Sequence, residues 1–364
     1  PTFIYVALTA MSGKMFYAIT FVVTGLIGIS IGSSLTTAAT IGVAFMSVGA
    51  ALDLNLAITA GAVISGAFFG DKMSPLSDTT ILASMVVEVD LFEHIKNMGW
   101  TTISAFILSF IFFAVISPSN INADLTNIES LKNTLLEMNL VHIYSIIPFI
   151  LLAVLAIKKV SAIFTLSAGI ISAILVSFFV QKEINLSGMM TMLFTGYAAN
   201  SGVEEVDLLL TRGGIESMMF SISLVLVALS LGGLLLKLNI IPALLEGAGK
   251  FLHKTYQLIT SAVFTAVGLN FLIGEQYLSI LLTGNAFREK FKQAGLHPKN
   301  LSRALEDGGT VINPLVPWSV CGIFLTSVLG VSTISYFPYV FFCLLCPVLS
   351  ILFGITGITI KKTA

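Results

Sequence analysis

Long apolar runs separated by short polar breaks occupy most of this chain. The clearest runs lie at residues 15–31, 35–52, 98–117, 141–157 and 334–357. A helix rises about 1.5 Å per residue, so runs of this length cross much or all of the hydrocarbon core of a bilayer. None of them alternates polar with apolar positions, as the strands of a membrane β-barrel do. The pattern predicts an all-α polytopic membrane protein.

One polar break interrupts an apolar, glycine-rich run rather than separating two runs. Residues 61–70 lead into Asp71 and Lys72, Pro75 follows, and apolar residues resume after Asp78. Proline removes a backbone donor and clashes with the preceding turn, so we expect the helix to break there. A charge at bilayer depth costs about 2.5–3.5 kcal/mol and marks a functional position. Broken helices with freed carbonyl and amide groups are how transporters build ion sites.

Short matches recur in the same order along the chain. Ile31-Gly32 matches Ile273-Gly274 (273 − 31 = 242), and Ser74-Pro75-Leu76 matches Asn313-Pro314-Leu315 (313 − 74 = 239). Such self-similarity predicts two structural repeats. Each repeat is expected to hold a helical hairpin followed by a broken helix. Inverted repeats with discontinuous helices place the substrate near the bilayer midplane.

The repeat predicts how the chain is divided. The first repeat covers 1–118, connecting spans cover 119–200, and the second repeat covers 201–364. The chain opens with Pro1 inside an apolar run, so we expect an N-terminal part to precede it. On the same reasoning, the counterpart of residues 215–241 is expected upstream of Pro1.

Lysine and arginine predict the orientation, because they are enriched on the cytoplasmic side of a membrane. The loops at 88–97, 158–159 and 288–303 and the C-terminus are then cytoplasmic, and the acidic connection at 119–139 is external. The two repeats have opposite orientations under this assignment. A multi-pass protein of the cell membrane is expected, surrounded by lipid.

Composition excludes several other functions. Of the 364 residues, 56% are hydrophobic and 10% are charged, whereas about a quarter of the residues of a soluble domain are charged. The mean hydropathy is +0.98, and a net charge of −1 offers no basic surface for nucleic acid. Cys343 and Cys346 lack a second cysteine pair, so we expect core packing rather than metal binding. No resident cofactor is expected. His94 and the other histidines are expected at the surface.

The candidate ion- and substrate-binding residues are the polar groups at the two breaks and the two hairpin tips: Asp71, Lys72, Ser74, Asp78, Thr79, Ser33, Ser34, Thr36, Glu275, Glu306, Asp307, Thr310 and Asn313. Asp71 and Asp78 are the expected ligands of transported Na⁺, since a hard cation prefers oxygen. A proton competes for the same carboxylate. Two alternatives stay open, namely that Asp71 pairs with Lys72 and that Asp78 caps the second half-helix.

The remaining candidates carry alternatives of their own. Lys72 either neutralises a carboxylate or binds a substrate carboxylate. Glu306 and Asp307 point about 100° apart on a helix, so one faces the cavity, unless both form a solvated helix start near Arg303. Hydroxyl groups can ligate an ion or bond to helix carbonyls. Arg212 and Glu216 have the four-residue spacing of a structural ion pair.

Four ordered motifs extend over nearly the whole chain: Gly32-Ser-Ser-Leu-Thr-Thr-Ala-Ala-Thr-Ile-Gly-Val-Ala, Gly70-Asp-Lys-Met-Ser-Pro-Leu-Ser-Asp-Thr-Thr, Arg212-Gly-Gly-Ile-Glu-Ser-Met-Met and Glu306-Asp-Gly-Gly-Thr with Pro314-Leu-Val-Pro-Trp. Together they resemble the NhaC family of sodium/proton antiporters, within the wider ion-transporter superfamily. The resemblance implies exchange of Na⁺ for H⁺. That family also includes members that exchange protonated malate for sodium and lactate.

Two segments, Gly274-Glu275-Gln276 and Val311-Ile312-Asn313, depart from the small hydroxyl residues commoner in a typical exchanger. The departure leaves the substrate open. The favoured function is a secondary sodium/proton antiporter, and the alternative is coupled exchange of a small organic anion or an amino acid. An intramembrane metalloprotease would need a His-Glu-x-x-His set, which is absent. An ion channel would need a continuous water path. The sequence leaves open whether the chain forms a homodimer.

Overall fold

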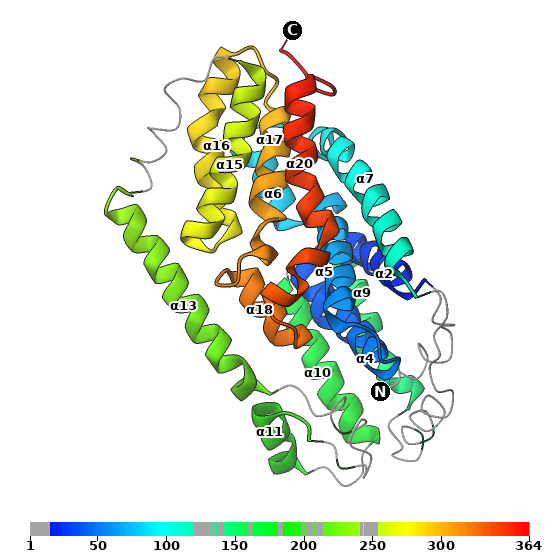
Figure 1. The fold of residues 1–364 in the computed structure, drawn as a ribbon. Helices are drawn as coiled ribbons and strands as arrows, with labels where there is room; N and C mark the ends of the chain where they lie inside the picture. The colour runs from blue at the N-terminus through cyan, green and yellow to red at the C-terminus, as the bar shows by residue number, and fades with distance from the viewer. Residues whose placement is uncertain are drawn as a thin grey trace.

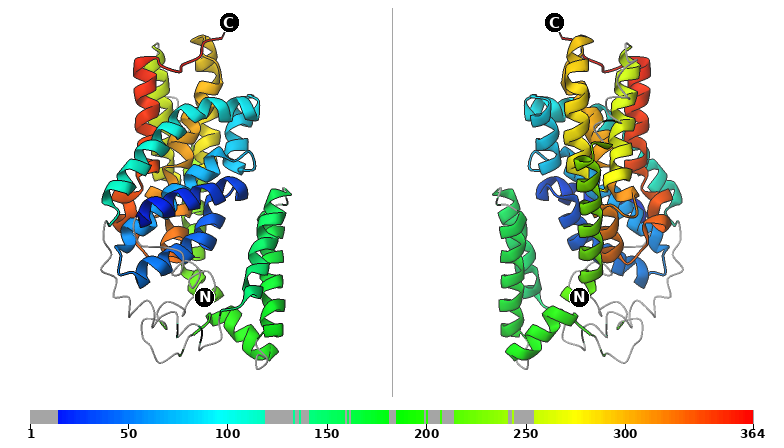
Figure 2. Two further views of the ribbon diagram at one scale, coloured as in Figure 1. Left: turned by 90° about the vertical axis from the view of Figure 1, so that its right-hand side faces the viewer. Right: turned by 90° about the vertical axis from the view of Figure 1, so that its left-hand side faces the viewer.

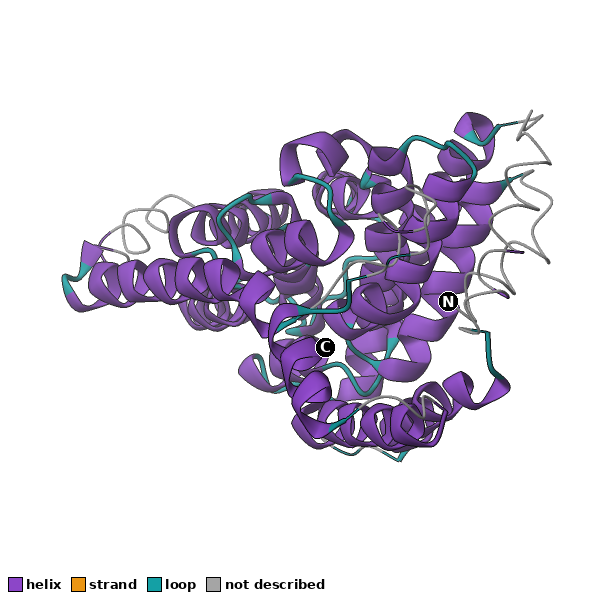
Figure 3. Ribbon diagram, turned by 90° about the horizontal axis from the view of Figure 1, so that it is seen from below, coloured by secondary structure: helices purple, strands orange, loops and turns teal. Residues whose placement is uncertain are grey.

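The computed structural model describes residues 15–118, 133, 136, 141–158, 160, 162–180, 185–198, 200, 207, 214–240, 243 and 254–363. The expectations for residues 1–11, and most of those for 119–139 and 238–254, lie outside this part of the chain. The described residues form helices and no β-strand (Figures 1 and 3). An all-α polytopic membrane fold is therefore confirmed.

The first repeat contains seven described helical segments: α2 (Phe16–Ile31), α3 (Ser34–Thr37), the π-helix η1 (Ala38–Gly42), α4 (Val43–Ala51), α5 (Leu56–Met73), α6 (Asp78–Val86) and α7 (Leu91–Ile116). Four segments connect the repeats or precede the second hairpin: α9 (Ile147–Ile157, after the 3-10 turn Ile143–Ile146), α10 (Ala162–Val180), α11 (Leu186–Thr195) and α13 (Ile215–Lys237). The second repeat contains α15 (Thr255–Ile273), α16 (Gln276–Gln293), α17 (Lys299–Leu305), the π-helix η3 (Glu306–Thr310), η4 (Asn313–Leu315), α18 (Val320–Leu329), α19 (Thr333–Tyr336), η5 (Phe337–Tyr339) and α20 (Phe341–Thr356).

The two repeats correspond element by element at a constant offset of 242 (276 − 34). Equivalent boundaries are Ile31 and Ile273, Ser34 and Gln276, Ala51 and Gln293, Asp78 and Val320, and Leu91 and Thr333. The match at an offset of 239 is therefore out of register by three residues. At the constant offset Pro75 corresponds to Pro317, and Asp71 corresponds to Asn313.

The two repeats run in opposite directions. In Figure 1 the α15–α16 hairpin lies in the upper half of the molecule, whereas α2 and α4 lie in the lower half. Helix α20 ends near the C-terminus at the top, whereas its counterpart α7 starts in the upper part and descends to about mid-height on the right. Figure 2 shows the same opposition from both sides.

Each hairpin turns on a glycine. Gly32 and Gly274 have φ values of 69° and 73°, a left-handed conformation that glycine adopts without steric cost. Their N–H groups bond at 2.8 Å to the carbonyls of Gly28 and Asn270, which closes α2 and α15. The next residue caps the returning helix, Ser33 in the first repeat and Glu275 in the second. Both predicted hairpins are confirmed.

Glycine also brings each hairpin onto its own broken helix. A Cβ added to Gly66 of α5 would collide with the Phe21 carbonyl oxygen of α2. The equivalent Cβ on Gly308 of η3 would lie 2.7 Å from the Val263 carbonyl oxygen of α15. The helices therefore pack backbone against backbone, as small residues allow in membranes.

The breaks lie where proline and serine predict them. Helix α5 ends at Met73, Pro75 follows, and Ser77 caps α6 through the Thr80 N–H. In the second repeat, residues 299–315 and 320–329 meet at an angle of 45°. The last span is also bent, by 59° near Val340, which the apolar run did not predict. Among the described residues, four helices are long and apolar enough to cross a membrane, or six if each bent pair is one span.

Two predicted loops are shorter than expected. Helix α7 begins at Leu91, so only the start of 88–97 is a loop. Helix α16 continues to Gln293 and α17 begins at Lys299, so the basic segment 288–303 is mostly helical. Both errors have one cause: amphipathic helix ends carry charges that look like loop residues in the sequence.

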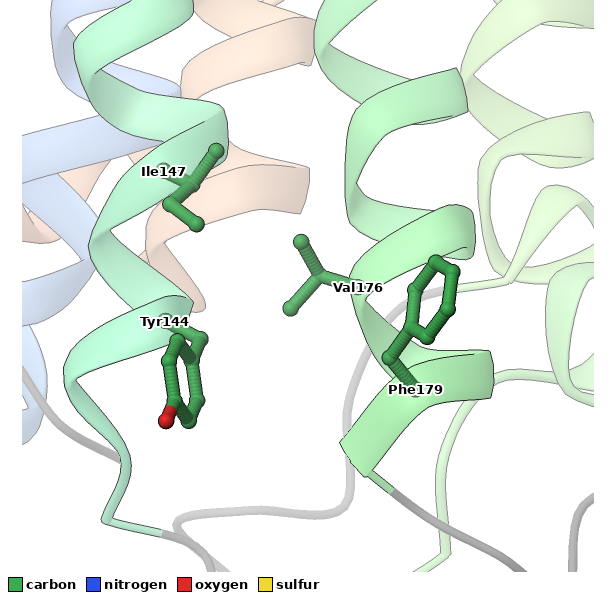
Figure 4. A pocket seen from close by; sticks show the side chains of 4 residues that line it. All are labelled: Tyr144, Ile147, Val176 and Phe179. Atoms are coloured by element: carbon green, nitrogen blue, oxygen red, sulfur yellow. The ribbon is translucent and has the colours of Figure 1, made fainter.

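Helices α9 and α10 pack together along the flank of the first repeat. An apolar pocket lies between them and is lined by Tyr144, Ile147, Val176 and Phe179 (Figure 4). None of these four residues is a candidate for ion binding. The candidate residues lie instead at the helix breaks and hairpin tips.

Candidate functional site

The two repeats are joined at their breaks by a buried ion pair. Lys72 lies in the last turn of α5 and Asp307 lies in η3, and both side chains are fully buried. The Lys72 ammonium donates to Asp307 Oδ1, which also accepts a 3.3 Å hydrogen bond from Thr101 Oγ1. The expected alternative, a pair between Lys72 and Asp71, is therefore wrong. The partner of Lys72 comes from the other repeat.

Asp71 lies next to this pair without a full set of partners. Asp71 is only 2% exposed, and its Oδ1 has no hydrogen-bond partner among the described residues. The hydroxyl groups of Ser34, from the first hairpin, and Ser77, from the break, lie close to its carboxyl group. A buried carboxylate needs a bound cation, a proton or hydrogen-bond donors. These surroundings leave the Asp71 carboxylate short of such partners.

Glu306, Asp307 and Thr310 lie in the π-helical turn η3, which the sequence did not predict. All three are fully buried, yet within the described part of the chain both carboxyl oxygens of Glu306, Asp307 Oδ2 and Thr310 Oγ1 have no hydrogen-bond partner. The solvated helix start is therefore wrong for this segment. Glu306 is close enough to Lys72 and Asp71 to interact with both charges. Turns of this kind are frequent at functional sites.

The buried charges of this centre do not balance. Asp71, Glu306 and Asp307 supply three carboxylates, and Lys72 and Arg303 supply two positive charges. Arg303 is 1% exposed and interacts with Asp307. Fully ionised, the set has a net charge of −1 (2 − 3). Since an uncompensated charge in a low-dielectric interior is costly, this centre favours the uptake of one further cation.

Asp78 lies at the outer edge of the first break and is exposed. Its Oδ2 accepts a 2.6 Å hydrogen bond from the hydroxyl of Tyr277, which belongs to the second hairpin. Ser77, not Asp78, is the N-cap of α6, although Asp78 Oδ1 accepts the Thr79 N–H at 3.0 Å. Thr79 Oγ1 is buried and pairs with Ser77 Oγ at 3.0 Å. Asp78 therefore connects the repeats rather than capping the helix.

The hydroxyl groups at the first hairpin tip and break support the backbone. Ser33 is the N-cap of α3 and its Oγ accepts the Thr36 N–H at 3.3 Å. Ser74 Oγ accepts the Leu76 N–H at 3.2 Å, within the break. Ser34 is 2% exposed and is the tip hydroxyl that lies at Asp71.

The second hairpin tip and break are internally bonded. Glu275 is 8% exposed and its Oε2 accepts the Leu278 N–H at 2.8 Å, so it serves as the N-cap of α16. Asn313 Oδ1 accepts the Cys321 N–H at 3.0 Å, and Asn313 Nδ2 donates to Asn270 Oδ1 at 2.8 Å. Both ends of the Asn313 amide are thus engaged.

Several residues near the site escaped the sequence analysis. His94, expected at the surface, is fully buried in α7 with Nδ1 2.7 Å from Ser302 Oγ. Arg303 donates to Thr359 Oγ1 at 2.9 Å, while its Nε and Nη2 have no partner. Asn270 could have been found, because it occupies the position of Gly28 at the offset of 242. No pattern signalled His94, Arg303 or Tyr277.

The ion pair predicted between Arg212 and Glu216 stays a prediction. Arg212 lies outside the described residues, and Glu216 is exposed in the first turn of α13.

The molecule has two inverted repeats, and each consists of a hairpin packed on a broken helix. Buried charges lie where the two breaks meet. These features define a multi-pass secondary transporter. Comparison with known proteins agrees. The model of the Na⁺/H⁺ antiporter family matches residues 6–85 and 66–358. The chain is 40% identical to the Na⁺/H⁺ antiporter NhaC of Alkalihalophilus pseudofirmus, over 100% of this chain and 78% of that protein. This chain therefore belongs to the Na⁺/H⁺ antiporter family.

Other relatives differ in their stated substrates. The Bacillus subtilis NhaC is 43% identical over 89% of this chain and 72% of that protein. A Bacillus subtilis protein named as a malate-2H⁺/Na⁺-lactate antiporter is 33% identical, over 98% of this chain and 76% of that protein. Identity to the sodium/proton antiporters is thus higher than to the organic-acid antiporter.

Proposed function

We propose that this chain exchanges Na⁺ for H⁺ across the cell membrane by alternating access. The observation that carries the proposal is the Asp71 carboxylate, which is almost fully buried at a helix break with one unpartnered oxygen. Membership of the Na⁺/H⁺ antiporter family supports the same function.

Competition at one carboxylate accounts for exchange. Na⁺ prefers the carboxylate and hydroxyl oxygens that Asp71, Ser34 and Ser77 can offer. A proton on Asp71 removes the negative charge that attracts the cation. Because the buried charges leave one negative charge uncompensated, the centre is expected to hold one of the two ions whenever it is closed to water. Exchange follows if the site opens to each side only when it is occupied.

The ion pair between Lys72 and Asp307 supports the geometry of the ion site. It fixes the end of α5 against η3 and so holds Asp71 and Glu306 in one centre. Lys72 also lies 6.0 Å from the centroid of the Phe342 ring, which further restrains its ammonium.

Exchange of an organic anion is the weaker alternative. Lys72, the residue expected to bind a substrate carboxylate, is engaged by Asp307. From the distribution of basic residues we further infer that 88–97, 158–159, 288–303 and the C-terminus face the cytoplasm. Association into a homodimer stays open.

The test is flux in reconstituted vesicles, comparing Asp71→Asn with Asp53→Asn. Asp53 is an exposed acid of the same repeat, with a φ of 50° that asparagine tolerates. We expect Asp71→Asn to abolish Na⁺-driven proton movement and Asp53→Asn to retain it. Each variant is checked for membrane insertion and for a monodisperse elution profile.

Unchanged sodium dependence in Asp71→Asn would remove Asp71 from the site. The same assay is run with and without malate, lactate or ornithine. Proton movement that requires malate or lactate would replace the simple exchanger with the organic-anion alternative, and proton movement that requires ornithine would replace it with the amino-acid alternative.

A further inference from the structure

The positions equivalent to the first-repeat ion site can be located in the second repeat, because the offset of 242 is constant. Asp71 corresponds to Asn313, Ser34 to Gln276 and Ser77 to Ser319. The backbone supports this register, since Ser77 and Ser319 both cap the half-helix after their break. The two repeats thus offer two equivalent places for an ion.

The equivalent position in the second repeat is occupied by side-chain amides. Asn270 Nδ2 donates to the carbonyls of Gly309 at 2.7 Å and Gly308 at 3.2 Å, and Asn270 Oδ1 accepts from Asn313 Nδ2 at 2.8 Å. Carbonyl and amide oxygens of this kind are what a hard cation would bind. Here they are engaged by N–H donors that belong to the protein.

Ser319, the counterpart of Ser77, is engaged in the same way. Its hydroxyl lies 2.5 Å from the Asn313 carbonyl oxygen and accepts the Gly322 N–H at 2.9 Å. Asn313 itself is neutral, so it adds no charge to attract an ion. By contrast, Asp71 carries a charge and has an unpartnered oxygen.

We propose that this protein carries a single Na⁺ per transport cycle, at Asp71, and that the hydrogen-bonded amides of Asn270 and Asn313 replace a second cation at the equivalent place. Asn270 and Asn313 thereby set the stoichiometry of cation binding. The inference rests on the proposed sodium/proton exchange and adds the number of ions to it.

The test is direct binding of ²²Na⁺ to the purified full chain in detergent. Wild type is compared with Asp71→Asn and with the double variant Asn270→Gly plus Asn313→Asp, which gives positions 270 and 313 the residues found at Gly28 and Asp71. We expect one Na⁺ per chain in wild type with a Hill coefficient of 1, none in Asp71→Asn, and two in the double variant.

Several results would overturn the inference. They are two ions per wild-type chain, one ion retained by Asp71→Asn, or a folded double variant that still binds one. If the double variant does not fold, the single variant Asn313→Asp takes its place, and one ion per folded chain of that variant would overturn the inference. Failure of the proposed function is distinguishable, because wild type would then bind no Na⁺ and drive no Na⁺-dependent proton movement.

Discussion

The break of the first repeat carries an aspartate where the break of the second carries an asparagine. The backbones of the two repeats are similar around these residues. Both hairpins turn on a left-handed glycine, and Gly66 and Gly308 make equivalent contacts with a hairpin carbonyl. The polar side chains disagree, since Asp71 has an unpartnered oxygen and Asn313 has both amide ends bonded. Packing is thus shared by the repeats, and charge is not.

The charged groups that join the repeats are also unequal. At the offset of 242, Lys72 corresponds to Pro314 and Asp307 corresponds to Ser65, so the ion pair has no symmetric copy. The comparison teaches that a duplicated scaffold supports a centre assembled from unlike halves.

Removing the ion pair is expected to have the largest effect. In Lys72→Met the buried Asp307 loses its cation, and breaking a buried pair costs about 3–5 kcal/mol. The double variant Lys72→Met plus Asp307→Asn leaves no unpaired member and should recover most of that stability. Thermal unfolding in detergent measures the stability of the single and the double variant. Additive losses in the double variant would show that the two residues do not depend on each other.

The shared packing is tested by alanine at the two equivalent glycines. Gly66→Ala and Gly308→Ala each force a methyl group against a hairpin carbonyl, and such overpacking costs about 1–3 kcal/mol. Gly268→Ala in α15 is the control, because a Cβ there has nothing within 4 Å. Similar losses for Gly66 and Gly308, and none for Gly268, are expected in the unfolding assay. A loss at one glycine alone would break the equivalence of the repeats.

A smaller effect is expected for Tyr277→Phe. This change removes the hydrogen bond to Asp78, which joins the second hairpin to the first break. A hydrogen bond to a charged group contributes about 1.5–3 kcal/mol, reduced here because both residues are exposed. We expect a several-fold rise in the KM for Na⁺ with the maximal rate retained. Tyr256→Phe, a tyrosine of similar exposure on the same hairpin, should leave both constants unchanged.

The smallest effect is expected at the periphery, for Glu88→Gln. The Arg288 guanidinium pairs with Glu88 and lowers the pKa of that carboxyl group below its ordinary value. A lowered pKa adds stability above the unfolded pKa, and this stability disappears as the pH falls through the folded value. Exposed pairs contribute little and are screened by salt. The melting temperatures of wild type and variant should differ only at low salt and neutral pH, and a difference that persists in acid would contradict this assignment.

The fold class, both hairpins and both breaks could be predicted from the sequence, because polar residues and proline inside apolar runs are rare. For the same reason Asp71, Lys72, Glu306, Asp307 and Asn313 stood out. The ion pair could not be predicted, since Lys72 and Asp307 are 235 residues apart and each has a nearer charged neighbour. The roles of the candidate residues stay predictions.

The register of the second break was misjudged for a specific reason. Two prolines, Pro314 and Pro317, lie close together, and the shared Pro-Leu dipeptide favoured the wrong one. Helix boundaries give the correct offset, and only that offset places Asn313 opposite Asp71. Helix η3 was missed because a π-helical turn has no distinct sequence pattern.

The backbone contacts at Gly66 and Gly308 have a consequence for how the molecule moves. A helix that rests on another through main-chain atoms resists sliding and rotation, so each hairpin and its broken helix are expected to move together. Under the proposed alternating access, the two repeats are then displaced relative to each other. The surface along which they shift is crossed by the Lys72–Asp307 and Tyr277–Asp78 contacts, so exposure of Asp71 to either side requires these contacts to rearrange.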